Sequence, residues 1–248
     1  MKSNNTRFTI MRLFFILFPF VVLTSQAQIE PKERLVNVYL YAADYAKEHK
    51  TVYLAKSNKG YHEIGLSRAN IYGPFKTNVS EDGRLLLCQR QSPPPEAETK
   101  VEYIYPPIAA VKIPGSMKEP LLILVPTEGQ MRYKALAIER SVTDFPMGSY
   151  KLINFSSRNV RGIIGKTLMQ VSAFKMTSFD PSKGNADDRL NVQFQYREGD
   201  RWHTFGSTTW ANRTDKRTLL CAYISPDTGR MKIRGIPVKE PFKVPSKN

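Results

Sequence analysis

Histidine and cysteine are scarce in this 248-residue chain, which has three histidines and two cysteines. His62 and Glu63 are adjacent, so on a strand their side chains point to opposite faces and cannot share a metal ion. Neither cysteine belongs to a CxxC pair, and Leu66 stands where the zinc-protease spacing HExxH needs its second histidine. We therefore expect no metal site and no cofactor.

Signatures of covalent catalysis are also missing. The chain has no GxSxG elbow, and the nearest serine after a glycine, Ser149, is typical of a turn that leads into a strand. Asp187 and Asp188 are adjacent in a polar loop, whereas glycoside cleavage needs two acids facing each other across a cleft. The sequence favours a protein that is not an enzyme, with an envelope hydrolase or carbohydrate-active enzyme as the alternative.

Long apolar runs are absent apart from Leu13–Leu23, which three basic residues precede. Ser25 and Ala27 then occupy the −3 and −1 positions that a signal peptidase reads. Eleven residues are too few to span a bilayer, which needs about 20. We predict a cleaved signal peptide over residues 1–27, no transmembrane segment in the mature chain, and a periplasmic or secreted location.

Acidic residues are outnumbered by basic ones, and the net charge is +15. Removal of residues 1–27 takes away three basic side chains and no acidic ones, which leaves +12. Outside the cytoplasm this balance favours an anionic envelope polymer or glycan as partner and makes nucleic acid a poor one. Because the basic residues are scattered along the chain, the alternative is that they serve only solubility.

Short runs of Val, Ile, Tyr, Phe and Thr alternate with Gly, Pro, Asn, Asp and Ser, a spacing typical of a sandwich or barrel. Strands are expected throughout, with clean alternation in Leu190–Tyr196, and only Ala42–His49 is a candidate helical turn. Strands with one solvent-exposed face are typical of antiparallel sheets. The prediction is an all-β, antiparallel β-sandwich, Ig-like or jelly-roll-like, with two similar domains.

Four segments follow from this interpretation: a signal peptide (1–27), an N-terminal β-domain (28–126), a C-terminal β-sandwich domain (127–238) and a flexible tail (239–248). The segment 72–88 aligns without gaps to 205–221, each interpreted as a loop that leads into a buried strand. This alignment places Cys88 opposite Cys221. The two cysteines are either joined by a disulfide, which an oxidising compartment permits, or remain separate buried thiols.

The aromatic residues near the C-terminus give the one candidate binding site. Trp202 and Trp210 flank Gly206-Ser207, which predicts a hairpin turn that would make the two rings neighbours. With Tyr196, Arg201 and Arg213 nearby, they would stack on sugar rings or hold a cation. The alternative is that the tryptophans are core residues packed as a cross-strand pair.

The stretch from Phe145 to Ser156 reads FPMGSYKLINFS. This FPxGxYxxxNxS pattern, with Ile163-Ile164-Gly165 after it, resembles a turn and strand found in uncharacterised exported bacterial proteins. The resemblance implies a secreted β-domain in which Asn154 and Ser156 bond the backbone of a bend, and it lends no site. We therefore predict an envelope binding or scaffold protein, with a subunit of a secreted assembly that meets a protein partner as a further alternative.

Overall fold

The computed structural model describes residues 33–95, 101–180 and 188–239. Within these ranges the chain forms β-strands and no helix, so no described segment is a helix able to cross a membrane. The predicted signal peptide (1–27) and all but the first residue of the predicted tail (239–248) lie outside the described residues.

Two sets of eight strands follow each other along the chain. The first set is β1 (Arg34–Ala42), β2 (Thr51–Ala55), β3 (Tyr61–Gly65), β4 (Tyr72–Val79), β5 (Arg84–Cys88), β6 (Pro107–Lys112), β7 (Pro120–Pro126) and β8 (Tyr133–Glu139). The second set is β9 (Tyr150–Asn154), β10 (Val160–Ile164), β11 (Thr167–Val171), β12 (Met176–Phe179), β13 (Arg189–Glu198), β14 (Arg201–Ala211), β15 (Thr218–Ile224) and β16 (Met231–Pro237).

The two halves have the same topology. The first half forms sheets with the orders β4-β1-β7-β8 and β3-β2-β5-β6, and the second half forms β12-β9-β15-β16 and β11-β10-β13-β14. Adding eight to each strand number of the first half gives the second half. The prediction of an all-β sandwich with two similar halves is therefore confirmed.

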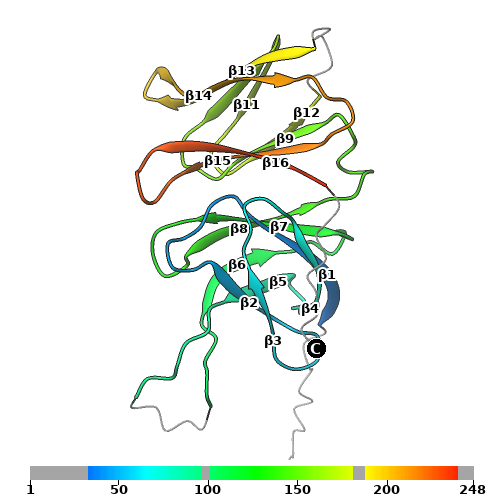
Figure 1. The fold of residues 1–248 in the computed structure, drawn as a ribbon, viewed down its shortest axis with the longest axis vertical. Helices are drawn as coiled ribbons and strands as arrows, with labels where there is room; N and C mark the ends of the chain where they lie inside the picture. Colours follow the sequence, from blue (N-terminus) through cyan, green and yellow to red (C-terminus); the bar gives the residue numbers. More distant parts are fainter. Residues whose placement is uncertain (1–32, 96–100, 181–187, 240–248) are drawn as a thin grey trace, which may run out of the picture. The chain divides into compact units, whose positions relative to one another are not determined.

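Three hydrophobic layers lie between the four sheets, which follow one another in Figure 1. The outer layers fill the two sandwiches, and the middle layer joins sheet β4-β1-β7-β8 to sheet β12-β9-β15-β16. The middle layer explains why β7 is buried on both faces. Leu122 and Leu124 enter one core, while Leu121, Ile123 and Val125 enter the other. Strands buried on both faces carry continuous apolar runs instead of alternation.

Two strand pairs are parallel, β1 with β7 and β9 with β15, and the other pairs are antiparallel. Both parallel pairs lie at the centre of sheets that are covered on two faces, where parallel pairing is usually found. The alternation in Leu190–Tyr196, with one solvent-exposed face, predicts antiparallel pairing for β13. This strand does pair antiparallel with both of its neighbours.

Several predicted elements differ from the structure. The expected helical turn at Ala42–His49 is the end of β1 followed by a loop that an isolated bridge between Ala46 and His49 closes, and 72–79, interpreted as a loop, is strand β4. Pro74 concealed this strand, although proline is tolerated at a sheet edge, where β4 lies. The aligned segments 72–88 and 205–221 are not equivalent, because β4 and β5 correspond to β12 and β13 and not to β14 and β15.

The predicted domain boundary between residues 126 and 127 falls inside a paired hairpin. β7 pairs antiparallel with β8 along its whole length, from Pro120 opposite Glu139 to Pro126 opposite Tyr133. The change from one half to the other therefore lies between β8 and β9. Hydrophobic runs marked most strands but not β4, and sequence spacing did not show which strands share a sheet.

Both cysteines are free and buried. Cys88 lies on β5 and Cys221 on β15, in sheets that have the sheet β4-β1-β7-β8 between them. The alternative of two separate thiols therefore describes the structure, and the disulfide does not form. Burial raises the pKa of both thiols, which keeps them protonated and unreactive.

Candidate functional site

An open seam between two edge strands forms the main groove of the second half. β14 ends the sheet β11-β10-β13-β14 and β16 ends the sheet β12-β9-β15-β16, so among the described residues each pairs on one side only. Between them lies a groove of about 660 Å³. In the first half, the equivalent strands β6 and β8 pack together more extensively than β14 and β16 do.

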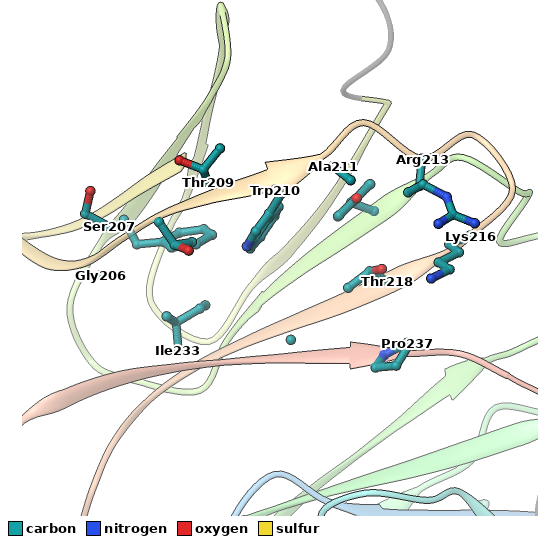
Figure 2. A pocket seen from close by; sticks show the side chains of 14 residues that line it. Gly206, Ser207, Thr209, Trp210, Ala211, Arg213, Lys216, Thr218, Ile233 and Pro237 are labelled. Atoms are coloured by element: carbon teal, nitrogen blue, oxygen red, sulfur yellow. The ribbon is translucent and has the colours of Figure 1, made fainter. Parts of the chain in front are cut away.

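Aromatic side chains form the floor of this groove. The ring of Trp210 stacks on Tyr150 of the facing sheet, with centroids 5.8 Å apart and an interplanar angle of 11°, and Phe194 packs at a tilt 5.8 Å from the same ring. Figure 2 shows Trp210 extending from β14 toward β16. The indole N–H of Trp210 has no hydrogen-bond acceptor in the described part of the chain, so it is free to donate to a ligand.

Gly206 sets the shape of the groove. A Cβ atom at this position would lie 3.2 Å from Cγ2 of Ile233 and 3.6 Å from the Phe194 ring, so the strands approach closely there only because residue 206 lacks a side chain. From this contact β14 and β16 diverge toward Arg213 and Pro237 (Figure 2). The groove is therefore a wedge that is narrow at Gly206 and open at its far end.

The open end is basic. Arg213 and Lys216 line it together with Thr218, and no carboxylate is part of the lining (Figure 2). Arg213 Nε donates to Asp215 at 2.7 Å, and this hydrogen bond lowers the pKa of the Asp215 carboxyl. Lys216 makes no ion pair with any described residue. Its ammonium is the charge best placed to bind an anion.

One hydroxyl group lies beside Trp210 on the groove face of β14. Ser207, Thr208 and Thr209 are exposed and line the groove. Thr208 shares the face of Trp210, whereas Figure 2 shows the side chains of Ser207 and Thr209 pointing away from β16. The Thr208 hydroxyl and the Trp210 N–H therefore provide the polar groups beside an aromatic floor. Ligand sites commonly have this composition, a mostly apolar surface with a few polar groups that fix orientation.

The predicted tryptophan hairpin is wrong. Gly206-Ser207 lies inside a single strand, β14, which pairs with β13 from Arg189 opposite Ala211 to Glu198 opposite Arg201. Trp202 and Trp210 are thus at opposite ends of one strand. The alternative holds in part: Trp210 packs against the core of the second half, but it stacks on the facing sheet and does not form a cross-strand pair with Trp202.

A β-bulge also places the two tryptophans on opposite faces. Phe194 lies opposite Gly206 but Gln195 lies opposite Thr204, so Phe205 is an extra residue that reverses the alternation. Trp210 faces the groove, whereas Trp202 lies on the outer face under the guanidinium of Arg161, which is 4.3 Å from its ring centroid. Of the predicted site residues, Trp210 and Arg213 line the groove together, and Trp202, Tyr196 and Arg201 do not.

Comparison with protein-family models and with curated proteins found no match to this sequence. The interpretation of the groove therefore depends on its chemistry alone.

Tyr150, Phe194, Lys216 and Ile233 are among the groove residues that the sequence analysis did not propose for the site. They come from four segments of the chain, and no local spacing joins them. Tyr150 and Phe194 had been assigned to strands, with Phe194 on the inward face of Leu190–Tyr196. Only the pairing of sheets across the sandwich brings them under Trp210.

A second cavity, of about 410 Å³, is lined by polar loop residues. Three carboxylates, Glu48, Glu128 and Asp227, line it from three loops and are all exposed. Partial burial and the charge of Arg132 lower the pKa of His49 in the same cavity. Exposed carboxylates lack the low-dielectric surroundings that tune catalytic acids and bases.

A third cavity, of about 630 Å³, lies beside β8 and β12. Its rim carries the exposed side chains of Met131, Phe174 and Met176, with the ammonium of Lys134 4.8 Å from the Phe174 ring centroid. Phe174 has a φ of 58°, a conformation that bulky residues rarely adopt. This apolar patch offers less hydrogen bonding than the seam between β14 and β16.

Proposed function

We propose that this protein is a non-enzymatic binding protein of the cell envelope, located outside the cytoplasm, that binds an acidic glycan in the groove between β14 and β16. The observation that carries the proposal is the composition of the groove, an aromatic floor that leads to Arg213 and Lys216 with no carboxylate in the lining. The predicted mature charge of +12 points in the same direction.

Each part of the groove matches a part of such a ligand. The apolar faces of sugar rings pack on aromatic rings, and the partly exposed Trp210, held in place by the buried Tyr150, provides one in the wedge. Sugar hydroxyls exchange hydrogen bonds with Thr208 and the indole N–H. The carboxylate, sulfate or phosphate group of an acidic sugar would then lie beside Lys216.

Binding of acidic and neutral polysaccharides to the mature protein tests the proposal, with calorimetry and tryptophan fluorescence as readouts. We expect the acidic polymer to bind and Trp210→Ala to weaken binding at least about tenfold, because loss of an aromatic hot-spot residue commonly costs about 2 kcal/mol or more. Trp202→Ala is the matched control, since Trp202 lies on the outer face of the same strand.

Salt dependence separates charge recognition from stacking. Binding should weaken as salt is raised to 0.15 M, where the Debye length is about 8 Å. Lys216→Gln should reduce both the affinity and this dependence. Equal binding of acidic and neutral polymers, or equal effects of the two tryptophan variants, would contradict the proposal.

The alternative of an envelope hydrolase would place its chemistry in the cavity with Glu48, Glu128 and Asp227. Its test is release of reducing ends or phosphate from the bound polymer during long incubation. Product that disappears in Glu128→Gln would favour the enzyme over the binding protein.

The alternative of an assembly subunit would use the apolar patch with Phe174 and Met176. Both side chains are more than half exposed, at 59% and 52%. Sedimentation of the mature protein over a range of concentrations would detect self-association, and Phe174→Ser should abolish it. A monomer at every concentration would count against this alternative for copies of the same chain.

A further inference from the structure

A second hollow lies on the same seam, beyond the contact between Gly206 and Ile233. It measures about 390 Å³ and is lined from β13 by Tyr196 and the carboxylate Glu198, from β14 by Thr204 and Phe205, and from the turn before β16 by Arg230. Arg158 contributes from the turn before β10. The two hollows therefore use different parts of the same pair of edge strands.

This second hollow is also aromatic and basic. The guanidinium of Arg158 lies 4.6 Å from the Tyr196 ring centroid and pairs with Glu198 at 2.9 Å. The side chain of Arg230 is exposed and has no hydrogen-bond or ion-pair partner in the described residues. Arg158 is thus largely balanced by Glu198, and Arg230 is the free cation of this hollow, as Lys216 is of the first.

The bulge at Phe205 produces this arrangement. Without the extra residue, Phe205 would continue the alternation set by Gly206 and point away from the seam. With it, both Phe205 and Gly206 border the seam, one in each hollow. Thr204 and Trp210, which mark the two hollows on β14, lie opposite Gln195 and Leu190, so they are about 17 Å apart at the rise of a strand.

We propose that the seam between β14 and β16 is one extended track that binds a polyanionic glycan chain at two subsites, with Lys216 as the cation at one end and Arg230 as the cation at the other, since Arg213 and Arg158 are paired with Asp215 and Glu198. This inference rests on the proposed function and names its ligand as a polymer instead of a single acidic sugar. A monosaccharide fills one hollow, whereas a chain crosses the Gly206 contact and reaches both cations.

Ligand length provides the test. The mature protein is titrated with a disaccharide and with a long oligosaccharide of the same acidic sugar. We expect the long chain to bind at least about tenfold more tightly, because joining two subsites makes the second contact intramolecular. Arg230→Gln should remove most of this advantage, so that the ratio of the two affinities approaches one.

Lys59→Gln is the control, because it removes the same charge from an exposed turn in the first half, far along the chain from the seam. Circular dichroism verifies that both variants are folded. Equal affinities for short and long chains would contradict the extended track, as would an Arg230→Gln variant that behaves like Lys59→Gln. Either result would leave the proposed site at Lys216 standing. Absence of binding to any acidic glycan would instead overturn the proposed function, as would binding of acidic peptides alone.

Discussion

Asp44 is the residue whose charge most directly joins the two halves. Its Oδ1 accepts hydrogen bonds from the Tyr45 N–H at 3.0 Å and from Arg68 at 3.2 Å. Its Oδ2 accepts from Tyr223 at 3.1 Å and from Lys232 at 3.3 Å. Burial alone would raise the pKa of Asp44, but these hydrogen bonds outweigh burial and hold the pKa below its ordinary value.

Asp44→Asn should destabilise the protein by about 1–3 kcal/mol at pH 7, the range for hydrogen bonds to a charged group. Because the folded state has the lower pKa, the carboxylate stabilises the fold above about pH 4 and loses this effect as pH falls through the folded-state pKa. Urea denaturation between pH 7 and pH 3 should therefore show a steeper loss for the wild type than for the variant.

Asp200→Asn is the control for this measurement. Asp200 is fully exposed and pairs with Arg197 on the surface, so its removal should change stability by less than about 1 kcal/mol. Identical pH profiles for the wild type and Asp44→Asn would show that Asp44 carries no such role.

Gly206 matters through the side chain that it lacks. Gly206→Val would press branched atoms against Ile233 and Phe194, so we expect a loss of about 1–3 kcal/mol, as in other overpacked sites. Gly65→Val is the matched control, because a Cβ at Gly65 meets nothing within 4 Å. Similar unfolding free energies for the two variants would contradict the close approach of β14 and β16.

At the scale of elements, the segment from Phe145 to Ser156 forms a turn and then strand β9. Phe145 is buried, and Gly148 adopts a φ of 76°. Asn154 donates to the carbonyl oxygens of Arg158 at 2.6 Å and of Ser172 at 3.1 Å. Its Oδ1 accepts from the Ser156 N–H at 3.0 Å, so the end of β9 is joined to two loops.

Asn154→Ala would leave these buried backbone groups without partners. Each unsatisfied group costs about 1–3 kcal/mol, so the melting temperature should fall strongly. The exposed Asn191→Ala on β13, which loses one bond of 3.5 Å, should differ little from the wild type. A small effect of Asn154→Ala would show that water replaces the amide.

β14 shows why the candidate site was only partly predictable. Sequence spacing identified Trp210 and Arg213, which do line the groove. It also paired Trp202 with Trp210, because Gly206-Ser207 has the composition of a turn. In the structure Gly206 instead lets β14 approach Ile233 of another sheet. This contact joins distant parts of the chain, so local sequence does not show it.

At the scale of the whole molecule, three hydrophobic layers hold the four sheets together without a disulfide. Cys221 lies in the middle layer and is fully buried. We predict that thiol labelling of the native mature protein is slow, that denatured protein shows two thiols, and that reductant leaves the melting temperature unchanged. Denatured, unreduced protein without free thiols would show that a disulfide had formed instead.

The sequence alone determined the class of secondary structure, because strand-length runs of β-branched and aromatic residues between turn residues leave little room for a helix. It also determined most strands, including β7 and β15. It did not determine the sheet to which each strand belongs, since hydrophobicity reports burial and not the identity of the partner.

Only the tertiary structure decided the site. The groove needs Tyr150 of β9 under Trp210 of β14, and Ile233 of β16 beneath Gly206. These contacts join residues distant in sequence, and they arise from packing two sheets face to face with one edge left open. The sequence shows which side chains are aromatic, basic or apolar. It does not show which of them lie close together across the sandwich, because that depends on strand order and on a one-residue bulge.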